Sequence, residues 1–416
     1  MFQLSDEQLM VRDAVRKFVE TEIRPRREEL EFGDCAPYDV LREFFRTFGM
    51  DALARDQFKK RIEVQREREE AEARGDEVPE KPGRSSDKDP ALSLIPVVEL
   101  SRCSPGLVTA LGVSTGLAAG TIMSKGTIEQ KERWGLDLLT LDKIGAWAIT
   151  EPGSGSDAFG GMKSTAVRDG DEYILNGSKT FITNGPFADT TVFICKLDEG
   201  NAPEDRKILN FVLDRGMPGF EQTKPLRKMG LHSSPTGELF LTDVRVGADR
   251  LLGGTEGSKG SGREGAKENF IIERSGVACM ALGLIERCLE LSVDYARDRV
   301  QFGKRIGDYQ LIQLKLAKME VARLNVTNLV YRTIEMRAAG EDMTLAEASA
   351  MKLYAAQSAT EVALEAVQLF GGNGYMAEYE VEQLARDSKV LQIYAGTDEM
   401  QIRHIAIDLL SREETA

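Results

Sequence analysis

Two short stretches near the middle of the chain place hydroxyl-bearing side chains next to glycines. They read WAITEPGSGSD (147–157) and KTFITNG (179–185), and Thr150, Ser156 and Thr183 fall at the ends of predicted strands. Glycine lets a backbone approach a ligand closely, and hydroxyl groups can both donate and accept hydrogen bonds. Each stretch alone is typical of an ordinary turn, but both would allow close approach of a flat polar ligand.

Histidine is scarce, and this limits the chemistry that the chain can perform. A Ser-His-Asp triad or a His-rich zinc site needs partners at recognisable spacing, and neither His232 nor His404 has them. Acid–base chemistry must therefore come from carboxylates or from a cofactor. The cysteines have no CxxC spacing, so we expect free thiols in a reducing compartment and no metal site. They are Cys35, Cys103, Cys195, Cys279 and Cys288.

Composition and charge narrow the class of protein. The chain is 42% hydrophobic and 29% charged, so it can bury a large core. Its length of 416 residues exceeds what a single core usually supports, and we therefore expect two or three domains. A net charge of −14 argues against nucleic-acid and membrane partners and favours a small-molecule substrate. We see no apolar run near the length of a membrane span and no signal peptide, and we therefore expect a cytoplasmic protein.

The sequence pattern changes twice, and this predicts an α+β multidomain protein. Residues 1–144 show helical periodicity, and 145–260 show short β-type runs separated by Gly, Asn, Asp and Pro. Residues 261–416 return to long helical periods. The expected order is an N-terminal α-helical domain, a middle antiparallel β-domain and a C-terminal helical domain.

Capping boxes and apolar stripes mark individual helices. Ser5 with Gln8, and Thr344 with Glu347, have the spacing of a capping box at a helix start. Three stripes recur at helical spacing, and we expect them to face the core. The stripes are Val277, Met280, Ala281, Leu284, Cys288 and Leu291; Leu314, Ala317, Val321 and Leu324; and Ala348, Met351, Ala355, Ala359, Val362, Ala366 and Leu369.

One segment interrupts this regular pattern. Residues 58–90 begin with charges of alternating sign at helical spacing and end in a stretch rich in Pro, Gly and Ser. Almost no apolar stripe is present to dock this segment. We predict a solvated, inserted arm rather than a binding module.

Three further blocks complete a resemblance to a known family. They are ARDRVQFGKRIGDYQ (296–310), QLFGGNGYMAEYEVEQLARDSKV (368–390) and IYAGTDEMQ (393–401). With the first two blocks, in this order, they resemble the acyl-CoA dehydrogenase flavoprotein family from the first helix to about residue 406. The resemblance fails clearly only at the inserted arm. It implies that family's fold with a C-terminal four-helix bundle, FAD as cofactor and an acyl-CoA as substrate.

The resemblance assigns the flavin side of the site to the middle domain. It implies that Thr150 binds the pyrimidine side of the flavin and that Ser156 lies near both the cofactor and the CoA entry. Phe181 would stack on the isoalloxazine, and the hydroxyl of Thr183 would lie at flavin N5. The supporting strand residues are Trp147 and Ile149.

The adenosine side of the cofactor falls to the C-terminal domain. The resemblance implies that Arg299 pairs with the pyrophosphate, because a guanidinium fork matches phosphate oxygens. Phe302 would pack on the adenine side, usually of the neighbouring subunit's cofactor. We therefore expect a homodimer or homotetramer. The other implied cofactor contacts are Gln368, Gly371, Gly372 and Thr397.

The turn at residue 395 lacks the acid that most of the family carries. There the turn reads I-Y-E-G-T, and its glutamate removes the proton α to the thioester carbonyl while the β-hydrogen leaves as hydride. This chain has Ala395 instead. In the isovaleryl and long-chain branches the base lies on the first C-terminal helix before an arginine, where this chain has Glu273 and Arg274. We therefore predict that Glu273 is the base. The predicted substrate-binding residues are Ser156, Arg274, Tyr394, Ala395 and Gly396.

Two other functions remain open. One is an acyl-CoA oxidase or another flavin-dependent oxidation on the same fold, and the other is a non-catalytic flavoprotein scaffold. The resemblance implies electron-transferring flavoprotein as the usual acceptor. Tyr394 is bulky where the isovaleryl branch has a small residue, which favours straight medium or long acyl chains over branched ones.

Overall fold

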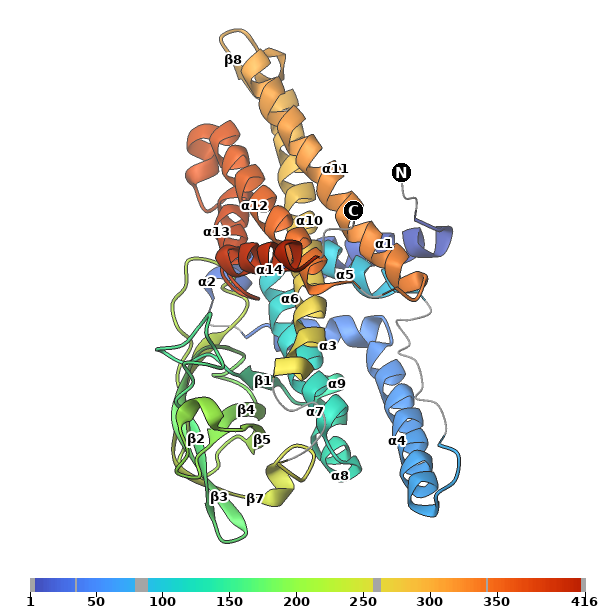
Figure 1. Ribbon diagram of the computed structural model, residues 1–416. Coiled ribbons are helices and arrows are strands. Elements are labelled where there is room, and N and C mark those ends of the chain that lie inside the picture. The colour runs from blue at the N-terminus through green and yellow to red at the C-terminus, as the bar shows by residue number, and fades with distance from the viewer. Residues whose placement is uncertain (1–3, 34–35, 79–88, 257–262, 342, 413–416) are drawn as a thin grey trace.

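The computed structural model describes residues 4–33, 36–78, 89–256, 263–341 and 343–412. Helices form both ends of the chain, and a β-sheet unit lies at one side of the helical body (Figure 1). The predicted order of helical, sheet and helical regions is confirmed. The first α-helix, α1 (Asp6–Phe18), begins at the predicted capping box of Ser5 and Gln8 and buries Val15 and Phe18.

The rest of the N-terminal region is a series of mostly short helices. They enclose an apolar core that is shared with the C-terminal helices. Their bounds are η1 (Val19–Ile23), η2 (Arg24–Arg26), α2 (Arg27–Phe32), α3 (Tyr38–Thr47), α4 (Met50–Arg74), α5 (Ala91–Ser101), α6 (Pro105–Leu111), η4 (Gly112–Ala118), α7 (Ala119–Lys125), α8 (Ile128–Gln130), η5 (Lys131–Gly135) and α9 (Leu136–Leu139).

The predicted inserted arm is in large part the helix α4. This helix begins at Met50, before the predicted start, and runs to Arg74 along one side of the molecule (Figure 1). Phe58 and Ile62 are buried against Ile128. The arm therefore packs on the rest of the protein through a small apolar contact near its start, which the charge pattern did not indicate. Residues 79–88 of the arm lie outside the described residues.

An apolar segment at Pro105–Lys125 has the length and composition of a membrane span, contrary to the expectation from sequence. It consists of α6, the π-helical stretch η4 and α7, and half of it is buried inside the protein. Leu107 lies in the main core, and Ala118 and Ile122 pack with Val192 of the sheet. A core helix of a globular protein satisfies the same criterion of length and hydropathy.

The middle region folds into one seven-stranded sheet with a separate apolar core. β3 pairs antiparallel with β2 and β7, but β4 runs parallel to β1 and to β2, so the sheet is mixed. The two runs predicted on either side of Gly177 form one long strand, β3, with an irregular register there. The bounds are β1 (Gly145–Ala148), β2 (Thr165–Asp169), β3 (Glu172–Thr183), β4 (Thr190–Leu197), η6 (Pro203–Asp205), β5 (Ile208–Asp214), β6 (Phe220–Gln222), β7 (Thr236–Gly247) and η7 (Ala248–Arg250).

The C-terminal region is a bundle of long helices. α10 packs against α11, α12 and the N-terminal α5, and its predicted stripe is largely buried. The predicted capping box of Thr344 and Glu347 is present at the start of α12. The bounds are α10 (Arg263–Asp298), β8 (Val300–Gln301), β9 (Lys304–Arg305), η8 (Ile306–Asp308), α11 (Gln310–Ala338), α12 (Leu345–Phe370), η9 (Gly371–Tyr375), α13 (Glu380–Val390) and α14 (Asp398–Ser411).

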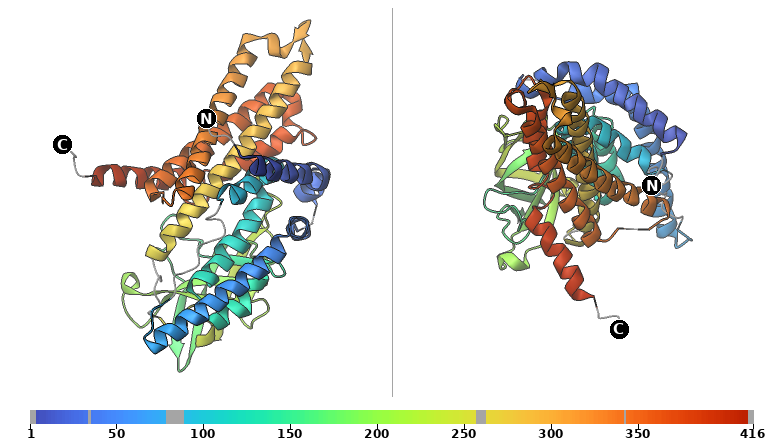
Figure 2. Two further views of the ribbon diagram at one scale, coloured as in Figure 1. Left: turned by 90° about the vertical axis from the view of Figure 1, so that its right-hand side faces the viewer. Right: turned by 90° about the horizontal axis from the view of Figure 1, so that it is seen from above.

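One apolar stripe that was predicted to face the core is instead exposed on the surface of the single chain. Leu314, Ala317 and Val321 of α11 are exposed, while Met319 and Val326 of the same helix are buried. α14 likewise exposes apolar side chains and projects away from the bundle (Figure 2). Periodicity identifies an apolar face but not what covers it, and the core of this chain covers the other face of α11.

Candidate active site

The turn between α13 and α14 has an unusual backbone. Ala395 has φ of 54° and Gly396 has φ of 84°, both in the left-handed region. A non-glycine residue in this region is strained, so the surrounding structure must hold it there. Thr397 ends the turn as the N-cap of α14, and its hydroxyl accepts the N–H of Met400.

Glu273 lies in the first third of α10 and is half-buried. Burial raises the pKa of its carboxyl group to about 7, although the positive charges of Arg274 and Lys352 act to lower it. A carboxylate whose pKa lies near neutral pH suits proton abstraction, because it is both available and sufficiently basic.

Tyr394 links Glu273 to the turn. Burial raises the pKa of its hydroxyl group, and the charge of Glu273 raises it further. The hydroxyl also lies 3.4 Å from Sδ of Met280, which is on α10 one turn beyond Val277. Glu273 therefore lies close enough to the turn for its charge to act on Tyr394.

Arg274, a predicted substrate-binding residue, is hydrogen-bonded to two other helices. It is only 3% exposed, Nη1 donates to Ser349 Oγ (3.1 Å) and Nη2 lies 3.4 Å from His404 Nδ1. These partners are on α12 and α14, so the guanidinium points into the protein beneath the turn. Nη2 of Arg274 also lies within 3.6 Å of where a Cβ atom on Gly396 would stand, so the guanidinium borders the turn.

On the sheet, the two glycine-rich stretches of the sequence lie side by side. Thr180 N–H donates to Thr150 O at 2.9 Å, which joins the end of β1 to β3. Thr150 and Thr183 are half-buried, and Ser156 is exposed. Phe181 has φ of 58° and its ring is 69% exposed. Trp147 lies on β1 and Ile149 directly follows it, where both pack into apolar clusters.

A buried ion pair holds these two stretches together. Lys179 Nζ lies 2.9 Å from Glu151 Oε1 and 3.1 Å from Ile149 O, and neither charged side chain is more than 5% exposed. Glu151 also accepts the backbone N–H groups of Lys163 and Ser164. Burial alone would raise the pKa of Glu151, but Lys179 and these donors lower it on balance.

Asn184 makes a second fixed junction just after β3. Its side-chain amide donates to Ala110 O (2.9 Å) and Gly145 O (3.0 Å), and its Oδ1 accepts the Tyr38 hydroxyl (3.0 Å). Asn184 has φ of 63°, which asparagine tolerates better than most residues. The KTFITNG stretch is thereby attached to both α3 and α6.

The predicted adenosine-side residues lie at the opposite end of the helical bundle. Arg299 and Phe302 belong to the hairpin of β8 and β9, which is far from the sheet (Figure 1). Arg299 follows Glu273 by 26 residues, and at a rise of about 1.5 Å per helical residue the two are about 39 Å apart. Gln368, Gly371 and Gly372 are exposed at the end of α12.

The exposed groups suit the two ends of FAD. The ring of Phe181 is uncovered beside the hydroxyls of Thr150 and Thr183, as a flat heteroaromatic ring requires. Among the described residues Arg299 has no ion-pair partner, and Phe302 is 94% exposed. A guanidinium, an exposed aromatic ring and a Gly-Gly backbone match a pyrophosphate and an adenine. The fold and these groups define a three-domain flavoprotein oxidoreductase.

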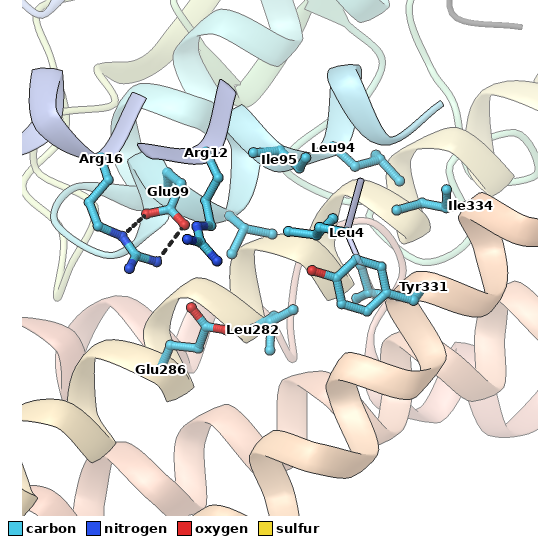
Figure 3. Close-up of a pocket in the computed structure, with 12 residues that line it drawn as sticks. Leu4, Arg12, Arg16, Leu94, Ile95, Glu99, Leu282, Glu286, Tyr331 and Ile334 are labelled. Carbon is cyan, nitrogen blue, oxygen red and sulfur yellow. Dashed lines mark hydrogen bonds and ion pairs between the residues drawn. The ribbon is translucent and has the colours of Figure 1, made fainter. Parts of the chain in front are cut away.

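A separate cavity of about 90 Å³ lies between α1, α5, α10 and α11 (Figure 3). Arg16 donates to Glu99 there, and Glu286 lines the other side. Glu286 follows Glu273 by 13 residues, or about 20 Å along α10. This cavity is too small for a CoA thioester and shares no residue with the site around Glu273.

Comparison with known families agrees with this architecture. The family model for the acyl-CoA dehydrogenase N-terminal domain matches residues 39–142, the middle domain matches 146–244 and the C-terminal domain matches 260–410. The chain belongs to the acyl-CoA dehydrogenase family, whose members are FAD-dependent oxidoreductases.

Individual relatives match over most of the chain. An acyl-CoA dehydrogenase of Bacillus subtilis is 37% identical over 96% of both chains. A caffeyl-CoA reductase-Etf complex subunit, CarC, of Acetobacterium woodii is 38% identical over 76% of this chain and 81% of its own. A glutaryl-CoA dehydrogenase of Mycobacterium smegmatis, solved in complex with FADH2, has a TM-score of 0.81 and 26% identity over 99% of this chain and 97% of its own.

Several residues that shape the site were not predicted from sequence. Glu151 and Asn184 stand inside recognised blocks, but nothing in the pattern shows that they are buried junctions. Lys179 and Lys352 are charged residues in an otherwise apolar strand and helix, where a fully buried lysine is rare. That contrast between residue type and position was the available signal.

Proposed function

We propose that this acyl-CoA dehydrogenase oxidises the α,β bond of an acyl-CoA thioester to the trans-2-enoyl-CoA, with Glu273 as the base. The observation that carries this proposal is the half-buried Glu273 carboxyl, with a pKa raised to about 7, whose charge acts on Tyr394 in the turn where residue 395 is alanine. Asp398 and Glu399 also follow this turn. Asp398 accepts hydrogen bonds from Gln357 and Gln392, and Glu399 is exposed.

The proposed step balances as follows. The carboxylate of Glu273 takes the α-proton, and the electron pair of that C–H bond becomes the new π bond between the α and β carbons. The β-hydrogen leaves with its bonding pair. FAD, when bound, supplies the acceptor for this hydride equivalent. The N–H groups of the turn would hold the thioester oxygen, which makes the α-proton more acidic.

We assign the cofactor contacts in two groups. The flavin end would lie on the middle domain, against Phe181 and Thr183. The adenosine end would lie against Arg299 and Phe302 of a second copy of the chain. The full cofactor set is Trp147, Ile149, Thr150, Ser156, Phe181, Thr183, Arg299, Phe302, Gln368, Gly371, Gly372 and Thr397. The proposed substrate set is Ser156, Arg274, Tyr394, Ala395 and Gly396.

We propose that the protein is a homodimer or homotetramer. Arg299 is about 39 Å from Glu273 along α10, so one chain would not place both against the reacting end and the pyrophosphate end of the same cofactor without a large span. The exposed apolar faces of α11 and α14 offer an interface, because large uncovered apolar patches mark association sites. Their exposed residues are Leu311, Leu314, Val321, Ile402, Ile407, Leu409 and Leu410.

We propose electron-transferring flavoprotein as the acceptor of the reducing equivalents. The relative from Acetobacterium woodii is named as part of a complex with such a flavoprotein. Steady-state turnover with purified electron-transferring flavoprotein, compared with turnover under dioxygen, would separate a dehydrogenase from an oxidase. The cytoplasmic location and the preference for straight acyl chains remain predictions.

The deciding experiment is anaerobic bleaching of the bound flavin by a panel of acyl-CoAs. We expect the parent protein to bleach and Glu273→Gln to bind acyl-CoA but lose roughly two to four orders of magnitude in reduction rate, the usual contribution of a positioned base. The double variant Glu273→Gln with Ala395→Glu should recover part of this loss, because it supplies a carboxylate from the turn. A parent protein that holds FAD but is bleached by no acyl-CoA would support a scaffold instead.

Stability at high pH provides the control for this variant. The folded pKa of Glu273, about 7, lies above its ordinary value of 4.5, so its burial disfavours folding once the group ionises. The free energy of unfolding therefore falls as pH rises from about 4.5 to 7. Glu273→Gln removes this cost, and we expect it to be at least as stable as the parent at pH 8. If Glu273→Gln were instead less stable than the parent, its loss of activity would reflect a structural role of Glu273 rather than its assignment as the base.

A further inference from the structure

Two buried side chains donate hydrogen bonds to the carbonyl groups of the turn at Ala395 and Gly396. Gln401 Nε2 donates to Ala395 O at 3.0 Å and to Gly396 O at 2.6 Å, and Lys352 Nζ donates to Gly396 O at 2.8 Å. Both side chains are fully buried, at 0% exposure. They come from different helices, Lys352 from α12 and Gln401 from α14.

The packing at Gly396 leaves little room for a side chain. A Cβ atom at Gly396 would lie 2.7 Å from Gln401 Nε2. Asp398 Oδ1 is 3.8 Å from Lys352 Nζ and partly balances its charge. Burying an ammonium and an amide costs free energy unless they are hydrogen-bonded, and the carbonyls of the turn supply these bonds. Burial accordingly lowers the pKa of Lys352 to about 8.

The direction of these hydrogen bonds decides which groups the turn presents. In a trans peptide the C=O and the following N–H point in opposite directions. With the carbonyls of Ala395 and Gly396 held on the side of Lys352 and Gln401, the N–H groups of Gly396 and Thr397 face the other way. Among the described residues, these two amides and that of Ala395 donate to no protein acceptor.

From this geometry we propose that Lys352 and Gln401 are positioning residues, which fix the peptide groups of the 395–396 turn so that its amides bind the thioester carbonyl of the substrate. The inference rests on the proposed function and deepens it. Because residue 395 carries no acid, the turn acts through its backbone alone, and the two side chains behind it set its catalytic geometry. Displacement of reacting groups by about 1 Å can cost on the order of 100-fold in rate.

The test compares Gln401→Met and Lys352→Met with the parent holoenzyme. We expect the limiting rate of flavin reduction to fall on the order of 10- to 100-fold. Affinity for an S-alkyl-CoA thioether should stay unchanged, because that analogue has no carbonyl oxygen. Bound cinnamoyl-CoA should show a smaller red shift of its absorption than in the parent, since the shift reports polarisation of the carbonyl.

Gln130→Met is the matched control. Gln130 is also buried, and its Nε2 donates to two backbone carbonyls, Asp249 O at 2.9 Å and Leu251 O at 2.7 Å, in a turn remote from Glu273. We expect this variant to lose stability while keeping the parental red shift and rate per bound flavin. If Lys352→Met does not fold, Lys352→Gln keeps a donor without the charge and should retain more of the red shift than Gln401→Met.

The outcomes distinguish this inference from the proposed function. A parent that acyl-CoA does not reduce contradicts the proposed function itself. If the parent is reduced and Gln401→Met keeps both the parental rate and the parental red shift, the positioning role is wrong while the function stands. Equal losses of red shift in Gln401→Met and Gln130→Met would likewise reduce Gln401 to a general structural role.

Discussion

The two ends of α10 differ in whether the polar groups beside them have partners within the same chain. Near its start, Glu273 acts by its charge on Tyr394 of a turn in which the carbonyls of Ala395 and Gly396 have buried partners, Lys352 and Gln401. Just beyond its end, Arg299 and Phe302 project from a hairpin with an exposed aromatic ring and, within the described chain, an unpaired guanidinium. Under the proposed function, the acyl chemistry would be built within one chain, whereas the adenosine end of the cofactor would need a second.

Subunit complementation tests most directly whether the two ends of α10 serve active sites of different chains. We expect Glu273→Gln and Arg299→Ala each to be nearly inactive, the first without its base and the second without most of its FAD. In a mixed dimer, one site would combine an intact Glu273 with an intact Arg299 from the other chain. Co-expression should then restore roughly a quarter of the parental activity for random pairing in a two-fold dimer.

The control for complementation is to mix the separately purified homodimers under conditions where subunits do not exchange. No activity should appear there. If co-expressed mixed dimers isolated by two affinity tags are also inactive, Arg299 serves the cofactor of its own chain, and the division between the two ends of α10 is wrong.

The next largest effect concerns the buried pair on the sheet. Lys179→Met leaves the Glu151 carboxylate buried without its cation, and breaking such a pair costs about 3–5 kcal/mol. We expect a markedly lower midpoint in thermal unfolding and weaker retention of FAD. Arg245→Met, which removes the more than half-exposed pairs to Asp169 and Glu172, is the control and should leave the midpoint unchanged.

A smaller effect, in the dependence of rate on pH, tests the catalytic end of α10. The rate of flavin reduction at saturating acyl-CoA should rise about tenfold per pH unit below 7 and level off above it, as Glu273 loses its proton. The groups that face Glu273 are Arg274 on its own helix, Lys352 on α12 and Tyr394 in the turn. Lys352→Met removes a positive charge, so the midpoint should move to higher pH.

Gln401→Met distinguishes charge from geometry in this profile. Glutamine is neutral, so its loss should lower the rate without moving the midpoint. A profile that is flat between pH 5 and 8 in the parent would mean that a group other than Glu273 limits proton transfer.

The sequence predicted the parts of this protein that depend on local pattern. The capping boxes at Ser5 and Thr344 and the order of helical and sheet regions follow from side-chain types at fixed spacing. The empty position at Ala395 and the candidate base at Glu273 were identified by resemblance, and their roles remain proposals. The structure adds that burial raises the pKa of Glu273 and that its charge acts on Tyr394 in the turn.

The unpredicted parts depend on contacts between distant segments. No local pattern brings Gln401 under Ala395 or Lys179 against Glu151, because these contacts arise only when separate elements pack. The apolar stripe of Leu314 and Val321 was assigned to the core, but periodicity does not distinguish an intramolecular core from an intersubunit one. The contacts of Arg274 with Ser349 and His404 likewise join helices that are distant in sequence.

The unbroken helix α10 also acts as a molecular ruler. It runs from Arg263 to Asp298 and carries the base near one end and the hairpin at the other. Deleting one residue between Glu273 and Arg299 would shorten it by about 1.5 Å and rotate the hairpin by about 100° about the helix axis. A point substitution on its surface leaves that spacing intact, whereas a single-codon deletion would misalign two sites at once. We therefore expect α10 to tolerate many surface substitutions but no change in its length.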